Sequence, residues 1–158
     1  MEIVTSLGAA ALALLLQTQG SQPDFGVDQA AATQPCTDQY ADSLNANSVS
    51  DEEWIAIISC VFTNTAAQMD AGLPEKIDEI TSLVSVSSNG ATFKYVYVLD
   101  VDVADVRQAN IDSLKAATRN NACTSANMVQ TMELGGSYFY RWVDRSGTLI
   151  TTMLIEGC

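Results

Sequence analysis

The sequence contains no histidine and few basic residues, and both absences exclude classes of function. Histidine is the usual base of a hydrolase triad and a frequent zinc ligand, so such a triad and a Cys/His zinc site are both excluded. The 158-residue chain carries 7 basic residues against 19 acidic ones, which gives a net charge of −12. Because phosphate groups are bound by clustered basic side chains, we expect neither nucleic acid nor an anionic membrane surface as a partner.

The apolar stretch near the start of the chain is too short to anchor the protein in a membrane. Residues 7–16 are ten uncharged, mostly apolar residues, whereas a membrane-spanning helix needs about 20. Their length and position are typical of an export signal, so we predict a signal peptide over residues 1–20, cleaved before Ser21. Glu2 departs from the usual basic start of such a signal, and a buried core helix is the alternative. No cysteine follows the stretch closely, so we expect no stable membrane anchor in the mature form.

The cysteines favour the same compartment. There are four, and none are arranged as Cys-x-x-Cys. An even number in an exported chain of this size is typical of two disulfides. Three connectivities are open, and we favour Cys36 with Cys60 and Cys123 with Cys158, because each bond would then link one half of the chain to itself. Four buried, reduced thiols are the alternative.

The N-terminal half predicts an arm followed by helices. Residues 21–35 are polar and contain two prolines, which indicates a flexible arm ahead of a single domain over residues 36–158. A short helix is expected from Cys36 to about residue 44. Ser50 and Glu53 have the spacing of a capping box, and apolar residues at helical spacing follow, so residues 51–69 are predicted to form an amphipathic helix.

The rest of the chain predicts two hairpins with helices between them. Residues 82–87 and 92–99 flank an Asn-Gly turn, and residues 137–143 and 148–155 flank a four-residue turn that ends in glycine. Between the hairpins we expect a helix from about Asp102 to the Asn120–Asn121 pair, and a second one from Thr124 to Glu133. The predicted fold is α+β in the order α-β-β-α-α-β-β, a four-stranded antiparallel sheet with helices packed on one face.

Clusters of acidic residues are the first candidates for chemistry, and a structural explanation is favoured for each. Three aspartates lie close together as calcium ligands do, but they lack the EF-hand spacing, and helix starts attract aspartate for capping. Two further acidic groups could supply the paired carboxylates that a glycosidase uses as acid and base. Their presence is also explained by solvated charges at the starts of helices, which is the explanation we favour. The three groups are Asp100, Asp102 and Asp105; Glu52 and Glu53; and Glu75, Asp78 and Glu79.

A serine paired with a lysine is the remaining catalytic possibility. Lys76, Lys94 and Lys115 are available, but no Ser-x-x-Lys motif occurs. A cysteine nucleophile would need an unpaired thiol and a base, and two disulfides leave no free thiol. We therefore predict no catalytic residue, no metal site and no cofactor.

Aromatic residues supply the one candidate binding surface. Tyr138, Tyr140 and Trp142 alternate along a predicted strand, so they share one face of the sheet. On an uncovered face they would form a partner surface, because tyrosine and tryptophan are frequent hot-spot residues in interfaces. The alternative, which we favour, is that the three side chains pack beneath the helices as core.

Several segments resemble small uncharacterised exported bacterial proteins. The segments are Leu73-Pro74 with Ile77, Asp78, Thr81 and Leu83; the Phe93-x-Tyr95-x-Tyr97-x-Leu99 strand; and the last two cysteines. In those proteins a Leu-Pro…Asp…Thr run precedes a Tyr-x-Tyr strand, and the chain ends in a cysteine after a hairpin. The order of elements is also similar to that of envelope accessory proteins such as secretion pilotins, although the lipidation cysteine of lipid-anchored members is missing. The resemblance covers residues 73–158 and implies export and this fold, but no catalytic residues.

Two functions from different classes follow. The first is a non-catalytic periplasmic or secreted binding protein, an envelope assembly component or an inhibitor, with a protein partner in the cell envelope. It is favoured by the export signal, the cysteines and the absence of catalytic groups. The alternative is a small secreted hydrolase that uses carboxylates or a Ser/Lys pair, and only the acidic clusters favour it.

Overall fold

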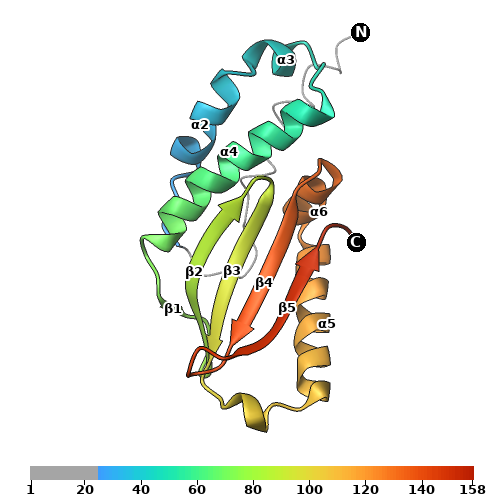
Figure 1. Ribbon diagram of the computed structural model, residues 1–158. Helices are drawn as coiled ribbons and strands as arrows, with labels where there is room; N and C mark the ends of the chain where they lie inside the picture. Colours follow the sequence, from blue (N-terminus) through green and yellow to red (C-terminus); the bar gives the residue numbers. More distant parts are fainter. Residues whose placement is uncertain (1–24) are drawn as a thin grey trace.

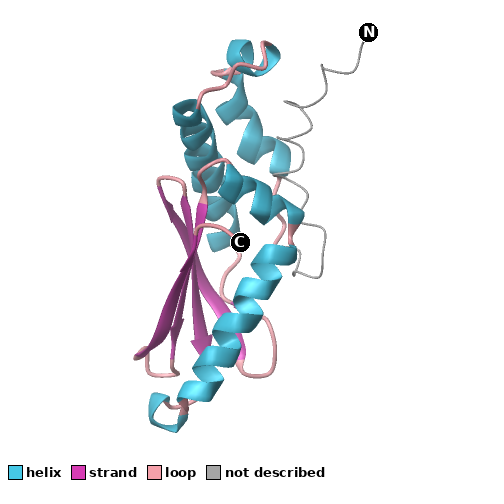
Figure 2. Ribbon diagram, turned by 90° about the vertical axis from the view of Figure 1, so that its right-hand side faces the viewer, coloured by secondary structure: helices cyan, strands magenta, loops and turns pink. Residues whose placement is uncertain are grey.

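Helices cover one face of a five-stranded sheet in this computed structural model, which describes residues 25–158 (Figures 1 and 2). The predicted signal peptide and the first part of the predicted arm lie outside the described residues. The helices are α2 (Gln29–Asp38), α3 (Ala41–Asn45), α4 (Asp51–Asp70), the 3₁₀ turn η1 (Val103–Asp105), α5 (Gln108–Thr124) and α6 (Ala126–Glu133). The strands are β1 (Glu75–Lys76), β2 (Thr81–Asn89), β3 (Thr92–Leu99), β4 (Ser137–Val143) and β5 (Leu149–Ile155).

The sheet is mixed, so the predicted four-stranded antiparallel sheet is wrong in two respects. A two-residue strand, β1, adds to the edge of β2, and β3 runs parallel to β4. Both predicted hairpins form as antiparallel pairs. The parallel pair follows from the crossover, because α5 and α6 return the chain to the end of the sheet where β3 begins. The 17-residue α5 and the eight-residue β3 are each about 26 Å long, so the helix spans the strand that it must retrace.

Helix α4 forms where the sequence predicted it and packs on the sheet. Ser50 Oγ accepts a hydrogen bond from the Glu53 amide, and the Glu53 carboxylate accepts one from the Ser50 amide, so the capping box is confirmed. One stripe of the helix, Ile58, Phe62, Ala66 and Met69, lies in the main core against β2 and β3. These residues recur every three or four positions and therefore share one side of the helix.

The opposite side of α4 contacts α2, which begins earlier than predicted. Residues 29–35, expected to be part of a flexible arm, are helical, and Pro35 lies within that helix. Asp28 caps α2 by accepting from the Ala31 amide at 3.0 Å. Cys36 is fully buried against Ile57 and Val61 of α4 in a second, smaller core. The arm prediction fails here because burial against α4 supplies the stabilisation that the polar composition of the segment does not show.

Both favoured disulfides are present. Cys36 and Cys60 join α2 to α4 with an S–S distance of 2.00 Å, and Cys123 and Cys158 join the end of α5 to the C-terminus at 2.07 Å. The first bond fixes the smaller core to the rest of the molecule. The second fixes the crossover helix to the residues that follow the edge strand β5.

The crossover helices begin later than predicted. Asp102 caps only η1, by accepting from the Ala104 amide at 2.9 Å, and α5 starts at Gln108 and continues past Asn120 and Asn121. Ser125, rather than Thr124, caps α6. The spacing of apolar residues along the sequence predicted both helices. It could not separate the short 3₁₀ turn that follows Asp102 from the start of α5.

The turn between β4 and β5 is organised by Asp144, whose side chain is almost completely buried. Its carboxylate accepts from the amides of Ser146 and Thr148, both at 2.8 Å, from the Ser146 hydroxyl at 2.6 Å, and from the Val103 amide at 3.2 Å. These hydrogen bonds lower the pKa of Asp144 from 3.8 to about 2, and the one from the Ser146 hydroxyl has the largest effect. The same residue therefore shapes the hairpin and holds the start of η1 against it.

We expect Asp144→Asn to destabilise the protein at neutral pH and to remove part of its acid sensitivity. A lowered pKa contributes stability that is complete above the unfolded pKa near 3.8 and is lost as the pH falls toward about 2. The difference in unfolding free energy between wild type and variant should therefore shrink between pH 4 and pH 2. Urea unfolding across this range measures it, and a difference that stays constant with pH would contradict the assignment.

Candidate binding surface

The predicted aromatic surface lies in the core, so its assignment as a partner surface is wrong. Tyr138, Tyr140 and Trp142 are 6%, 7% and 3% exposed and point from β4 toward the helices. The Tyr140 ring stacks on Trp142 at 5.7 Å and on Tyr95 of β3 at 5.0 Å, measured between centroids. Burial raises the pKa of Tyr138 to about 12 and raises that of Tyr140 as well. These three residues therefore stabilise the fold, which was the favoured alternative.

The candidate catalytic carboxylates Glu53 and Asp78 are far apart, and each accepts hydrogen bonds from its local backbone. Glu53 lies at the start of α4, and Asp78 lies in the β1–β2 loop at the opposite end of the molecule in Figure 1. Glu53 accepts from the Ser50 amide and the Ser43 hydroxyl, which lowers its pKa. Asp78 accepts from the amides of Ile80 and Thr81, and the Ile80 hydrogen bond is the main reason that its pKa is lowered. Each carboxylate is explained by its local backbone.

The aspartates near η1 are separated in the same way. Asp102 caps η1, whereas Asp100 faces Arg145, whose Nε lies 3.7 Å from the Asp100 carboxylate. Across residues 25–158, no group of three or more cysteine, aspartate or glutamate side chains could hold a metal ion.

The lysines proposed for a Ser/Lys pair are spread over the sheet and α5. Lys76 and Lys94 belong to the sheet, and Lys115 belongs to α5. Lys76 is the cross-strand neighbour of Ser82, but its side chain is exposed. A catalytic lysine is typically held in a buried, apolar site, whereas the side chain of Lys76 is exposed in the described part of the chain.

No helix covers the other face of the sheet in the described part of the chain, and we call it the open face (Figure 2). Strand register places its side chains in three rows across the sheet. The first row is Ser87, Lys94, Phe139 and Leu154, and the second is Ser85, Val96, Arg141 and Thr152. The third is Lys76, Ser82, Val98, Val143 and Leu149.

Apolar and basic side chains are mixed on the open face. Phe139, Val96 and Val98 are half-buried, and Leu154 is 46% exposed, so an apolar surface faces solvent. Lys94 and Arg141 stand beside it on β3 and β4, and the strands contribute no carboxylate to this face. The alternation of Lys94, Val96 and Val98, and of Phe139, Arg141 and Val143, was visible in the sequence. The adjacency of the two strands was not.

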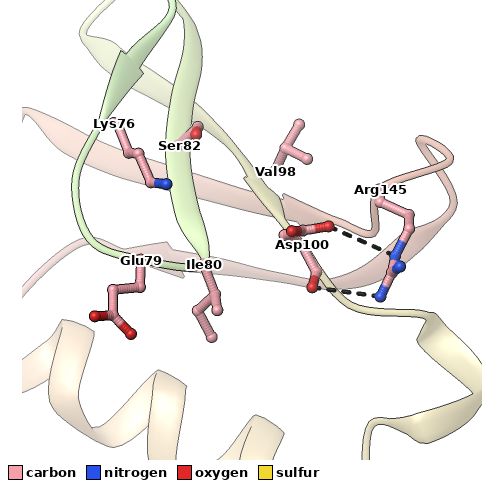
Figure 3. A pocket seen from close by; sticks show the side chains of 7 residues that line it. All are labelled: Lys76, Glu79, Ile80, Ser82, Val98, Asp100 and Arg145. Carbon is pink, nitrogen blue, oxygen red and sulfur yellow. Dashed lines mark hydrogen bonds and ion pairs between the residues drawn. The ribbon is translucent and has the colours of Figure 1, made fainter.

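A shallow pocket of about 260 Å³ lies at one end of the open face (Figure 3). Lys76, Ser82 and Val98 line it from the sheet, and Glu79, Ile80, Asp100 and Arg145 line it from the loops. Arg145 is held there by the Asp100 carboxylate and by a hydrogen bond to the Asp100 carbonyl at 3.4 Å. The pocket thus extends the open face beyond the strands, as far as the guanidinium group of Arg145.

The fold is similar to those of three solved bacterial proteins. The first is EpsS, a pilotin from the Vibrio vulnificus type 2 secretion system, with a TM-score of 0.56 and 17% identity over 66% of this chain and 92% of that one. The second is AspS, a type 2 secretion pilotin from Vibrio cholerae, with a TM-score of 0.53 and 15% identity over 66% and 93% of the two chains. The third is a Pseudomonas aeruginosa protein described as secreted, with a TM-score of 0.55 and 16% identity over 62% and 88%.

At these identities the likeness establishes a shared fold. No protein-family model and no curated protein matches the sequence. Within residues 25–158, no helix is both long and apolar enough to cross a membrane.

Proposed function

We propose that this protein is a non-catalytic accessory protein of the cell envelope, periplasmic or secreted, which acts by binding a protein component of an envelope assembly. The observation that carries the proposal is the similarity to two type 2 secretion pilotins over 92% and 93% of their chains. Because the match takes in almost the whole of each pilotin and 66% of this chain, the similarity extends beyond one common motif.

Three features of the molecule support this role. The disulfides Cys36–Cys60 and Cys123–Cys158 are typical of proteins that fold in an oxidising compartment, such as the periplasm. The carboxylates that a hydrolase would use, Glu53 and Asp78, accept backbone hydrogen bonds at opposite ends of the molecule. The open face, which is free of helices and mixes exposed apolar and basic side chains, offers an area for contact with a protein.

Deletion of the gene in the source organism tests the proposal. We expect an envelope complex, such as that of a type 2 secretion system, to lose assembly on native gels, and export of its cargo to fall. Re-expression of the full chain should restore both, because a binding protein acts only when it is present. Normal assembly and export in the deletion strain, together with hydrolytic activity of the purified chain on a glycan or peptide panel, would contradict the proposal.

A further inference from the structure

We infer that the open face is the docking surface for an acidic segment of the partner protein, in which apolar side chains are flanked by aspartate or glutamate. The inference rests on the proposed function for the existence of a protein partner. It adds the face that binds and the chemistry that this face selects.

Charge is distributed unevenly over the molecule, and the open face is one of its two basic regions; the other is α5 with its cap, which carries Arg107, Lys115 and Arg119. Four of the 7 basic residues lie on this face or at its end: Lys76, Lys94, Arg141 and Arg145. Within the described part of the chain, the strands contribute no carboxylate to this face, and Glu79 and Asp100 line the pocket at its end. In a chain with a net charge of −12, the open face is thus a surface that would attract carboxylates, and it differs from α5 in placing exposed leucines, Leu149 and Leu154, beside its cations.

The central cations of this face are available to a partner. Among the described residues one ion pair forms, between Arg145 and Asp100, so neither Lys94 nor Arg141 has a carboxylate within 4.0 Å. Arg141 is exposed, and Lys94 lies one row away on the neighbouring strand. Two basic side chains without an internal partner, in a chain rich in carboxylates, leave an unmatched positive potential at the middle of the sheet.

Apolar contacts complete the surface. Phe139 and Leu154 are cross-strand neighbours, and Val96 lies on the adjacent strand beside Arg141. Leu154 is 46% exposed and Leu149 is 48% exposed, so apolar area remains to be buried by a partner. Apolar burial supplies binding free energy, while the flanking cations select the partner and fix its register.

The charge of the whole chain favours a protein segment over a lipid surface or a nucleic acid. A membrane or a polyanion extends far beyond one sheet face and would meet the acidic remainder of the molecule. Charges interact over about 8 Å at physiological ionic strength, so an extended anionic surface would feel that repulsion. A short segment can contact the open face alone.

Photo-crosslinking in the source cells tests the inference with the full chain. A photoreactive amino acid is placed at Ser87 or at Leu154, both exposed on the open face, and as a control at Ser113, which is exposed on α5. We expect protein adducts from the two open-face positions and none from Ser113, with the crosslinked peptide rich in aspartate or glutamate. Lys94→Glu/Arg141→Glu should lower the adduct yield by about tenfold. Arg107→Glu, at the exposed start of α5, should leave it unchanged.

The other outcomes overturn the inference and separate its failure from that of the proposed function. Protein adducts from Ser113 alone would exclude the open face as the docking surface. A crosslinked peptide without acidic residues would exclude an acidic partner segment. Either result would still support a protein partner. Adducts with lipid alone, together with binding to phosphatidylglycerol vesicles, would replace the protein segment with a membrane. An absence of protein adducts at all three positions would also count against the proposed function. Thermal unfolding of each variant confirms that its fold is retained.

Discussion

Replacing all four cysteines with serine will leave the protein largely unfolded at room temperature. The bonds close loops of 24 and 35 residues, and the chain-entropy model gives each a contribution of about 3.5–4 kcal/mol. Their sum approaches the total stability of an ordinary domain, about 5–15 kcal/mol. Cys36 is fully buried, so a serine there also places a hydroxyl group in the smaller core.

The contributions of the two disulfides to stability can be measured separately by replacing one cysteine pair at a time. Cys36→Ser/Cys60→Ser and Cys123→Ser/Cys158→Ser should each remain folded with a lower urea midpoint, and the first should lose more because it also disturbs the contact between α2 and α4. Circular dichroism during urea unfolding measures these effects. A wild-type midpoint that is the same with and without a reducing agent would show that the disulfides do not stabilise the fold.

Trp142→Ala will destabilise the protein by about 3–5 kcal/mol, the usual cost of removing a buried tryptophan. Trp142 is 3% exposed, and its ring stacks on Tyr140 at 5.7 Å and on Tyr97 of β3 at 6.2 Å. The substitution therefore removes apolar burial and contacts on two strands at once. It also leaves a cavity beneath the helices.

The neighbouring residue on β4 is the matched control. Arg141 has an exposed side chain on the opposite face of the same strand, so Arg141→Ala should change the unfolding free energy by about 0.5 kcal/mol or less. Chemical unfolding of both variants gives the comparison. Equal losses for Trp142→Ala and Arg141→Ala would mean that the aromatic residues of β4 are not part of the core.

Features set by neighbouring residues could be predicted from the sequence. The capping box needs only Ser50 and Glu53, three positions apart, and the first hairpin needs only the Asn-Gly turn between two alternating strands. The favoured cysteine pairs, chosen from three open connectivities, rested on order along the chain and are the pairs that form. In each case the interaction that decides the structure is encoded within one short segment or within one half of the chain.

Features set by distant packing could not be predicted in the same way. Nothing in β3 or β4 alone states that they are parallel, because this depends on where α5 and α6 return the chain. The polar composition of residues 29–35 hides a helix that depends on burial of Cys36 against α4.

The candidate surface was visible only in part. Alternation along β4 separates Tyr138, Tyr140 and Trp142 from Phe139 and Arg141, but it does not say which set the helices cover. The structure places the larger aromatic set beneath the helices and leaves the mixed apolar and basic set exposed. The pairing of Val96 with Arg141 across β3 and β4, which joins the cations to the apolar patch, requires the parallel register.

Affinity capture of the full chain from its native cell envelope at low salt, with mass spectrometry of all retained proteins, tests the proposed binding function most directly. We expect one protein partner to be retained in stoichiometric amount and to be released as the salt concentration rises, because charge complementarity contributes to the contact. A capture that retains no protein above the level of an unrelated acidic control would contradict it, and would direct attention to a small-molecule ligand or a substrate.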